Sequence, residues 1–250
     1  MIIANPAAGT ITDDLVDELE LLCRQRIRDV TVYWTAEPGH ATKLAAASST
    51  SYGEVLVVAV GGDGTVREMV HGLAGNPGPT AMFIVPGGTS NSCYRSFWGT
   101  VGWPEALDAA LTDPGAHVRR LDLALLAENG NLVLAGAATG FPPQAVHAAE
   151  GLRHVTGPAR YEKALKDLAG SYEPYPGRVV VDGIEVHRGP TMLANAGGSR
   201  YRGGQFLVLP HSVVDDGLLD VCVIGGEHSP AEMLSLARTG EHVTRSGVIY

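Results

Sequence analysis

Short apolar runs that end at glycine or polar residues dominate the first half of the chain. Four runs have the length and β-branched composition of strands: Met1–Ala4, Asp29–Trp34, Val55–Val60 and Ala81–Val85. The segments between them have helical spacing and are predicted as helices: Thr12–Arg26, Ala41–Ala47 and Val66–Ala74. Strands that are apolar throughout indicate a parallel sheet covered on both faces. We therefore expect an α/β domain with a parallel, Rossmann-like sheet and ligand-binding loops at the carboxyl ends of its strands.

From Asp122 onward the pattern changes to strands joined by tight turns. The predicted strands are Leu123–Leu126, Asn131–Ala137, Arg178–Val181, Pro190–Ala194 and Asp220–Ile224. Asn129-Gly130-Asn131 and Asp182-Gly183 are typical hairpin turns. Helical spacing interrupts this pattern at Leu152–Gly170 and His228–Thr239. We expect a second, mostly antiparallel β-sandwich domain, with the first domain over residues 1–121 and the second over residues 122–250.

Composition narrows the class of protein. The chain has 250 residues, of which 45% are hydrophobic, enough for one large core or two modest ones. A net charge of −9 argues against nucleic acid as a partner and against tight adsorption to anionic lipid, so any membrane contact should be transient. The cysteines Cys23, Cys93 and Cys222 are too scattered for a disulfide framework or a zinc site.

Location and assembly follow from the same features. The apolar runs are far shorter than the ~20 residues that cross a bilayer. The first residues, Met1 to Pro6, carry neither a basic leader nor a long apolar stretch, so no signal peptide is expected. We expect a cytoplasmic protein, and a homodimer stays open as its assembly.

The segment Gly61-Gly62-Asp63-Gly64-Thr65 directly follows a predicted strand and precedes a predicted helix. Such a junction exposes backbone amides to phosphate oxygens, and the helix N-terminus adds a positive field. An aspartate there repels phosphate, so Asp63 is interpreted as a ligand for phosphate-bound Mg²⁺ or as a base for an acceptor hydroxyl. The structural alternative is a tight turn with Asp63 and Thr65 as capping residues.

Two more loops follow strands of the same predicted sheet. Pro86–Asn91 offers the Thr89 hydroxyl and the Asn91 amide as hydrogen-bonding groups, although it is also compatible with a purely structural turn. Asn5–Gly9 follows the first strand with small residues that would let a nucleotide lie against the backbone. Because carboxyl ends of parallel strands share one edge, we expect the three loops to converge.

In order and spacing, these loops resemble the catalytic domain of the diacylglycerol kinase, sphingosine kinase and bacterial lipid kinase superfamily. The resemblance extends to Gly39-His40-Ala41 in the first half of the chain. In the second half it rests on Asn195, Gly203-Gly204, Leu209-Pro210 and the segment Asp215–Val221. It therefore covers nearly the whole chain.

The resemblance implies ATP and Mg²⁺ as cofactors. The implied nucleotide-binding residues are Asn5, Pro6, Ala7, Ala8, Gly9, Thr35, Gly62, Asp63, Gly64, Thr65, Val66, Arg67, Glu68 and Thr89. A structural magnesium is implied at Val213, Asp216 and Leu218, where oxygen ligands suit a hard cation. Asp216 is also compatible with an ordinary hairpin turn. Asp122 resembles an acidic residue that links the active site to hydrated magnesium, and the alternative is a salt bridge with Arg119 or Arg120.

The chain departs from the family pattern at two places. Ser92 follows Asn91 where relatives commonly carry aspartate, so one carboxylate of the expected magnesium network is missing. The late Asp-Gly-Glu of relatives, whose glutamate is their expected base, and the final return segment that carries it are also missing. The segment Asp182–Glu185 is predicted as a hairpin and does not replace it. Asp63 is therefore the catalytic candidate.

The function expected from these features is transfer of the γ-phosphoryl group of ATP to a hydroxyl of a lipid or lipid-like alcohol. One alternative is a kinase for a soluble or specialised-metabolite acceptor or for NAD. Another is a catalytically impaired protein that binds nucleotide or lipid.

Overall fold

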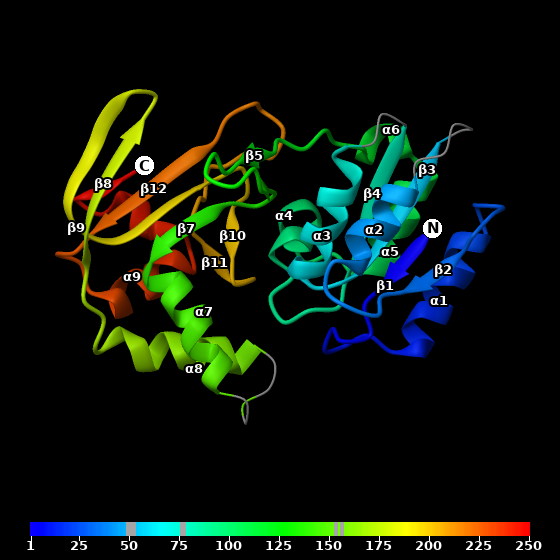
Figure 1. The fold of residues 1–250 in the computed structure, drawn as a ribbon, viewed down its shortest axis with the longest axis horizontal. Helices are drawn as coiled ribbons and strands as arrows, with labels where there is room; N and C mark the ends of the chain where they lie inside the picture. The colour runs from blue at the N-terminus through cyan, green and yellow to red at the C-terminus, as the bar shows by residue number, and fades with distance from the viewer. Residues whose placement is uncertain (49–53, 76–78, 153–154, 156–157) are drawn as a thin grey trace. The chain divides into compact units, whose positions relative to one another are not determined.

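The computed structural model describes residues 1–48, 54–75, 79–152, 155 and 158–250. Within them the chain forms two compact units, Met1–Arg120 and Leu121–Tyr250 (Figure 1). The first unit is built on parallel strands with helices, and the second on antiparallel strands.

The sheet of the first unit is parallel, as the uniformly apolar runs predict. Its strands are β1 (Ile2–Ala4), β2 (Val32–Trp34), β3 (Val55–Gly61) and β4 (Thr80–Pro86), in the order β2-β1-β3-β4. All of β1 and the second half of β3 are buried, which explains why neither shows the alternation of a half-exposed strand. The prediction of an α/β domain with a Rossmann-like sheet is therefore confirmed.

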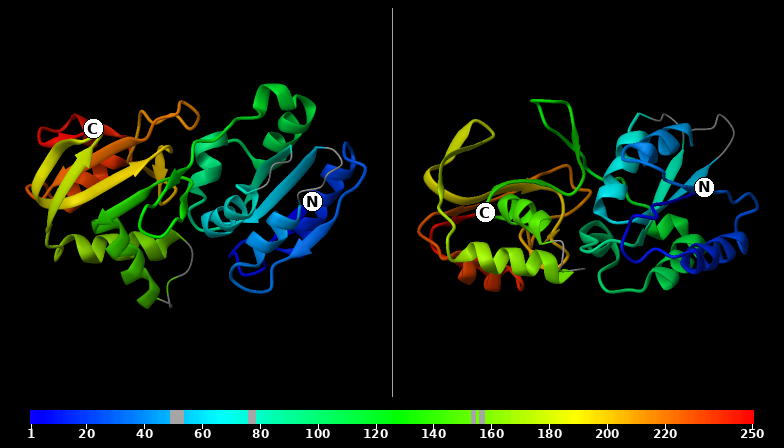
Figure 2. Two further views of the ribbon diagram at one scale, coloured as in Figure 1. Left: turned by 45° about the horizontal axis from the view of Figure 1, so that its top comes forward. Right: turned by 60° about the horizontal axis from the view of Figure 1, so that its bottom comes forward.

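Helices cover both faces of this sheet. They are α1 (Asp13–Arg24), α2 (His40–Ala47), α3 (Asp63–Leu73), α4 (Ser92–Trp98), α5 (Trp103–Thr112) and α6 (Pro114–His117). Helices α2 and α3 pack together on one face, and α1 and α5 lie on the other (Figure 2). Helix α1 begins where the Thr12 hydroxyl accepts a hydrogen bond from Leu15 N, and it buries Val16, Leu19 and Cys23.

The strand order places a topological switch point between β1 and β3. From β1 the chain moves to β2 on one side, whereas from β3 it moves to β4 on the other side. The chain that leaves β1 and the chain that leaves β3 therefore run to opposite sides of this pair of neighbouring strands. In open α/β sheets such a switch point is where ligands bind.

The second unit contains a five-stranded antiparallel sheet. Its strands are β7 (Ala137–Gly140), β8 (Tyr175–Val181), β9 (Ile184–Gly197), β12 (Asp220–Gly225) and β13 (Val248–Ile249). Two short hairpins accompany it, β5 (Ala124–Leu125) with β6 (Leu132–Val133), and β10 (Tyr201–Arg202) with β11 (Phe206–Leu207). The mostly antiparallel second half agrees with the sequence-based prediction.

Helices α7 (Phe141–Gly151), α8 (Pro158–Ala169) and α9 (Pro230–Ala237), together with the 3₁₀ turn η1 (Glu241–Thr244), complete the second unit. Helices α7 and α8 pack against each other, and α7 also packs on β9. The core of this unit joins the three helices to the sheet through Phe141, Ala145, Leu165, Met192, Leu193, Phe206, Val208, Leu209, Cys222, Ile224, Met233 and Ala237.

Both predicted hairpin turns are present. Asp182 and Gly183 have φ values of 50° and 81°, the left-handed conformation that a two-residue type I′ turn needs, between the paired residues Val181 and Ile184. Gly130 has a φ of 72° and donates from its N–H to Leu126 O. The prediction that Asp182–Glu185 forms a hairpin is therefore correct.

The helix predictions differ from the structure where proline begins a helix. Helix α7 carries Pro142 and Pro143 in its first turn, and α5 carries Pro104 there. Proline usually signals a break in a helix, but it fits the first turn, where no intrahelical N–H donor is needed. The predicted helix Leu152–Gly170 is α8, which begins at Pro158; residues 153–154 and 156–157 lie outside the described residues. Helix α3 begins at Asp63 and not at Val66.

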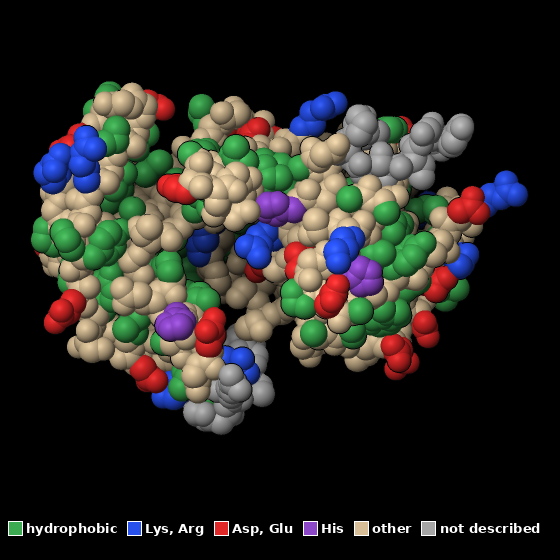
Figure 3. All heavy atoms as spheres, viewed as in Figure 1, with side chains coloured by type: hydrophobic (Ala, Val, Ile, Leu, Met, Phe, Trp, Pro, Cys, Tyr) green, Lys and Arg blue, Asp and Glu red, His purple; other side chains and the backbone are tan. Residues whose placement is uncertain are grey.

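In the part of the chain that the structure describes, no helix combines the length and apolarity needed to cross a membrane. On the face drawn in Figure 3, acidic and basic side chains are interspersed over both units.

Candidate functional site

The loops that follow β1 and β3 are joined by side chains at the switch point. Asn5 Nδ2 donates a hydrogen bond of 2.9 Å to Thr65 Oγ1, across 60 positions of sequence. Asn5 Oδ1 accepts one from Ala7 N at 3.0 Å, which turns the first loop back on itself. Thr65 is buried and fills the space that the missing Gly61 side chain leaves. The two loops are therefore held together by these side chains.

The loop after β4 lies directly against the loop after β3. A Cβ added at Gly88 would overlap Gly62 Cα, and one added at Gly62 would lie 3.0 Å from Gly88 Cα. Gly87 N donates to Gly61 O at 2.9 Å, and Gly87 O accepts from Thr10 N at 3.3 Å. Glycines are needed here because two backbones meet without room for side chains. The three loops predicted to converge do meet.

Asp63 connects the second loop to helix α4. Its Oδ2 accepts a hydrogen bond from Ser92 N at 3.0 Å and its Oδ1 accepts one from Cys93 N at 2.9 Å. Those amides belong to the first turn of α4, where backbone donors have no partner within the helix. The carboxylate therefore acts as a helix cap from another segment, a role that sequence analysis missed because it weighed only metal binding, base chemistry and local turns.

The N-terminus of α3 itself has no side-chain cap. Its N-cap residue is Gly62, and the amides of Asp63, Gly64 and Thr65 form the first turn. Gly64 is exposed, with no other atom within 4 Å of a Cβ built on it, so the loop backbone can be approached closely there. The N-terminus of this 11-residue helix, with its uncapped amides, carries the positive end of the helix dipole and can attract an anion.

The remaining predicted nucleotide-binding residues lie around this junction. Thr35 follows β2 and donates from its N–H to Ala4 O at 2.9 Å, beside the first loop. Thr89 is exposed, and Asn91, with a φ of 49°, bonds both ways to the Gly88 backbone. The exposed residues Pro6, Ala7, Gly9 and Arg67 and the partly buried Ala8 and Glu68 flank the loops, whereas Val66 is buried.

His40 closes a local turn. Its Nδ1 accepts a hydrogen bond from Ala36 N at 3.0 Å, just before its own helix α2. This is a capping contact, the ordinary structural role for a single histidine at a helix start.

In the second unit, two carboxylates are fixed on the turn predicted to hold magnesium. Asp216 Oδ1 accepts from Leu218 N at 3.0 Å, and Asp122 Oδ2 accepts from Gly217 N at 2.6 Å. The turn is not a hairpin, because it connects β11 with β12, which pair with other strands. The Asp216 interpretation as a hairpin turn is therefore wrong, and Asp122 is bound to this turn rather than to a neighbouring arginine.

The donor chemistry of this turn fits a hard cation. Asp216 is an exposed carboxylate, and the backbone carbonyls of the exposed residues Val213 and Leu218 supply further oxygen. Among the described residues, no group of three or more His, Cys, Asp or Glu side chains is arranged to hold a metal ion. A cation at this turn would therefore depend on carbonyl oxygens and water.

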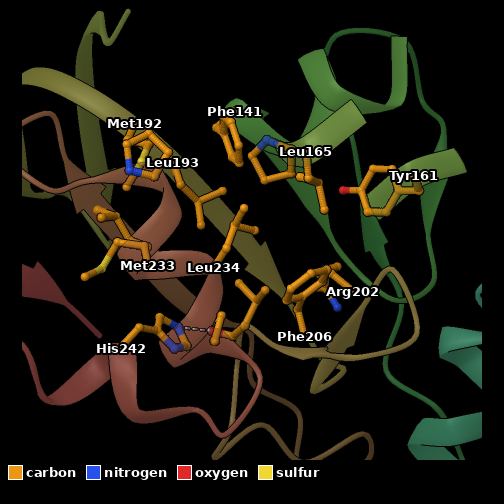
Figure 4. A pocket seen from close by; sticks show the side chains of 15 residues that line it. Phe141, Tyr161, Leu165, Met192, Leu193, Arg202, Phe206, Met233, Leu234 and His242 are labelled. Atoms are coloured by element: carbon orange, nitrogen blue, oxygen red, sulfur yellow. Dashed lines mark hydrogen bonds between the residues drawn. The ribbon is translucent and has the colours of Figure 1, made fainter. Parts of the chain in front are cut away.

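The second unit also contains an apolar pocket that is open to solvent (Figure 4). Its walls come from α7, α8, β9, β10, β11, β12, α9 and η1. The lining residues are Phe141, Pro142, Tyr161, Leu165, Met192, Leu193, Arg202, Phe206, Val208, Ile224, Pro230, Met233, Leu234, Ala237 and His242. Sequence analysis missed it because these positions look like ordinary core residues.

Two polar residues of the pocket wall are held by the protein. The Arg202 guanidinium donates to the carbonyl oxygens of Ala135, Ser199 and Tyr201 and to Asn195 Oδ1, at 2.8 to 3.0 Å. His242 is fully buried, and its Nε2 lies 3.1 Å from Val208 O; because a carbonyl only accepts, Nε2 carries the proton. Burial lowers the pKa of His242 below its usual value.

Comparison with known proteins matches both units to family models. Residues 1–126 match the model described as "Diacylglycerol kinase catalytic domain". Residues 135–250 match the model described as "YegS C-terminal NAD kinase beta sandwich-like domain".

Curated relatives carry lipid kinase names. A "Probable lipid kinase YegS-like" from Pseudomonas fluorescens is 31% identical over 197 residues, which cover 78% of this chain and 62% of the relative. One from Chromohalobacter salexigens is 34% identical, covering 87% of this chain and 68% of the relative. A Mycobacterium tuberculosis "Diacylglycerol kinase" is 30% identical, with 82% and 66% covered. The matches therefore span about two thirds of the relatives.

The fold matches solved structures as well. A crystal structure of a "putative diacylglycerol kinase" from Bacillus anthracis superposes with a TM-score of 0.72 and 25% identity, covering 92% of this chain and 74% of that one.

Proposed function

Because the chain belongs to the diacylglycerol kinase catalytic domain family, we propose that it is an ATP-dependent kinase whose acceptor is a hydroxyl of a lipid or lipid-like alcohol. The observation that carries this proposal is the meeting of three glycine-containing loops at the switch point of the first unit. The identity of the acceptor class rests separately on the apolar pocket of the second unit.

The nucleotide phosphates would lie against the loop backbones. The uncapped amides of the first turn of α3 supply donors, and the missing side chain at Gly64 leaves the backbone open. The loop Asn5–Gly9 and the Thr89 hydroxyl would hold the rest of the nucleotide, with Thr35 beside them. Most of the catalytic effect expected of such a site comes from positioning and charge neutralisation.

Asp63 would act on the acceptor or on the nucleotide-bound cation. Each of its carboxylate oxygens accepts one amide hydrogen bond and keeps a second lone-pair position. The two contacts with α4 hold the carboxylate in one orientation, which a group that orients or deprotonates a hydroxyl requires. Bound Mg²⁺ would supply neutralisation of the phosphate charge, and a structural ion would be held by Val213, Asp216 and Leu218.

The acceptor is proposed to be lipid-like because of the pocket lining. Its side chains are almost all aliphatic or aromatic, so burying hydrocarbon there is favourable by roughly 25 cal/mol for each Å² removed from water. A sugar phosphate or NAD would instead leave polar groups in the pocket without partners, which is unfavourable. A soluble acceptor therefore fits this pocket less well than a lipid one.

The direct test is phosphoryl transfer from radiolabelled ATP to a panel of acceptors. Diacylglycerol, monoacylglycerol, a sphingoid base, glycerol and NAD would each be offered to the purified chain with Mg²⁺. Label in one or more of the lipids supports the proposal. Label in NAD or glycerol alone would overturn the acceptor class, and ATP binding without any labelled product would overturn the kinase assignment.

A second candidate is a protein that binds nucleotide and lipid without turnover. It is favoured by the residue at the Asp63 contact, where Ser92 stands at the position for which the family resemblance implies an aspartate. The variant Ser92→Asp distinguishes an active kinase from a protein without turnover. If the unaltered chain has no transfer activity and Ser92→Asp has some, the unaltered chain is catalytically impaired. Measurable activity in the unaltered chain excludes this second candidate.

A further inference from the structure

Three polar side chains form a closed hydrogen-bonded network at the apolar pocket of the second unit. Arg238 Nη1 donates to Gln205 Oε1 at 2.6 Å, and Arg238 Nη2 donates to Glu162 Oε1 at 2.8 Å. Gln205 Nε2 donates to the same Glu162 oxygen at 3.1 Å. We call these residues the polar triad. Its hydrogen bonds from Arg238 and Gln205 lower the pKa of Glu162, so the carboxylate stays charged at neutral pH.

Every member of the triad is the sequence neighbour of a residue that lines the pocket. Glu162 follows Tyr161 on α8, Gln205 precedes Phe206 of β11, and Arg238 follows Ala237 at the end of α9; the lining residues are Tyr161, Phe206 and Ala237. The Arg238 guanidinium also lies over the Phe206 ring, 5.3 Å from its centroid. The triad therefore ties together three of the elements that form the pocket wall.

Tyr161 is held in one orientation by this wall. A Cβ at Gly203 would lie 2.8 Å from Tyr161 Cε1, and Gly203 has a φ of 57°, so the ring packs on a glycine that no other residue replaces without strain. The neighbouring residue Glu162 is held by the polar triad, which ties this turn of α8 to Gln205 and Arg238. The ring is therefore restrained by its packing on Gly203 and by the anchored helix turn that carries it.

The Tyr161 hydroxyl is directed into the pocket. In Figure 4 the side chain extends from α8 toward Leu165 and the other lining residues, with its oxygen leading. Burial raises the pKa of Tyr161 to about 12, so the group is a neutral hydrogen-bond donor over the physiological range. Within the described part of the chain, this hydroxyl forms no hydrogen bond.

The other polar groups of the wall have different roles. The nitrogens Nη1 and Nη2 of Arg202 are bonded to protein oxygens, and His242 is fully buried. The lining is otherwise mostly hydrocarbon, and the Tyr161 hydroxyl is the polar group that extends into the pocket. A donor in an apolar environment gains most from an acceptor that is itself poorly hydrated, such as a carbonyl oxygen attached to a hydrocarbon chain.

We propose that the Tyr161 hydroxyl donates a hydrogen bond to the acyl carbonyl oxygen of an ester-linked lipid whose hydrocarbon chain occupies this pocket. The proposal rests on the lipid-like acceptor proposed above and adds the feature of the lipid that is recognised. An ether-linked lipid of the same length has the same hydrocarbon and lacks the carbonyl. The pocket should therefore distinguish ester from ether.

The test compares the equilibrium binding of dioctanoylglycerol with that of its dioctyl ether analogue. Both affinities are measured by titration calorimetry in the presence of dilute detergent. The unaltered chain should bind the ester about fivefold more tightly, the expected size for one hydrogen bond. Tyr161→Phe should reduce ester affinity to that of the ether and leave ether affinity unchanged. Equal binding of both lipids by the unaltered chain, or equal loss of both in Tyr161→Phe, would overturn the proposal.

The triad provides a second variant that leaves Tyr161 in place. Arg238→Met keeps an apolar stem over Phe206 and removes the hydrogen bonds to Glu162 and Gln205. It should lower the ester preference to about twofold, because the Tyr161 orientation loosens. The matched control is Arg188→Met, which breaks a similarly exposed contact with Glu185 on β9 and should leave the preference at its original value. The same loss in both variants would argue against positioning by the triad.

Binding does not require turnover, so the two proposals fail separately. Ester discrimination without phosphoryl transfer would contradict only the kinase assignment. Transfer to lipids without ester discrimination would contradict only the role of Tyr161.

Discussion

Asn5 donates a hydrogen bond to Thr65 across the switch point of the parallel sheet, and this contact makes one structure of two loops that are 60 positions apart. The Thr65 methyl and hydroxyl also occupy the space above Gly61. Thr65 therefore acts as a spacer between the first loop and the turn that carries Asp63. The geometry of the proposed phosphate site depends on a side chain that need not touch the nucleotide.

Replacing Thr65 with valine tests this spacer. Thr65→Val preserves the shape and removes the acceptor for Asn5, which should weaken ATP binding about three- to tenfold and destabilise the fold by about 1 kcal/mol. Titration calorimetry with ATP measures the first effect and urea unfolding the second. Thr42→Val is the control, since Thr42 bonds to Glu68 O on the next helix without bridging loops. Unchanged ATP affinity in Thr65→Val would contradict the spacer role.

Asp63→Asn should separate chemistry from folding. The amide keeps one oxygen for an α4 amide and loses the second acceptor, so the unfolding free energy should fall by about 1 kcal/mol. Phosphoryl transfer should fall at least 100-fold, the range for loss of an acid–base group. Asp108→Asn, which removes a surface contact with Arg26, is the control and should retain activity. Full activity in Asp63→Asn would disprove the assigned role.

Two glycine substitutions should have opposite effects. Gly88→Ala places a methyl group on Gly62 Cα and should destabilise the first unit by about 1–3 kcal/mol. Gly64→Ala has open space and helical backbone, so its stability should hold or rise by up to about 1 kcal/mol. ATP affinity should nevertheless fall in Gly64→Ala, because the methyl group would occupy the surface proposed for phosphate. Thermal unfolding with and without ATP measures both properties.

His242 predicts a pH dependence of stability. Burial lowers its pKa in the folded state below the ordinary value of 6.5, so below that pH the unfolded chain binds more protons than the folded one. Stability should therefore fall as pH decreases from 6.5 toward the folded-state pKa, and this residue should contribute no pH dependence above 7.5. Urea unfolding at pH 5.5 and 7.5 tests this against His242→Gln. The variant should lose stability at pH 7.5 and show a smaller difference between the two pH values.

Local patterns predicted the parallel sheet well. A uniformly apolar run such as Val55–Val60 is stable as a strand only when both of its faces are buried. Its environment in the sheet can therefore be predicted from its composition alone. The turns at Asp182-Gly183 and Asn129-Gly130 were equally predictable, because few residue pairs adopt the left-handed backbone conformation at low energy.

Contacts between distant segments could not be predicted from local sequence patterns. The use of Asp63 as a cap for α4 requires knowing that Ser92 and Cys93 approach it, and no local pattern encodes that approach. The apolar pocket was missed for a related reason. A side chain such as Leu165 has the same helical spacing whether it meets a packed neighbour or open space, so the sequence distinguishes core from cavity only through the tertiary fold.

The central position of β1 has a consequence for biosynthesis. Ile2, Ile3 and Ala4 are synthesised well before their partner β3, which ends at Gly61, and Met1 donates from its amino group to Leu56 O. Until β3 has left the ribosome, β2 is the only partner strand available to the nascent β1, and its other edge stays unpaired. The interval between synthesis of β1 and of β3 should thus be the one in which this unit depends most on chaperones, because the exposed strand edge is free to pair with other chains.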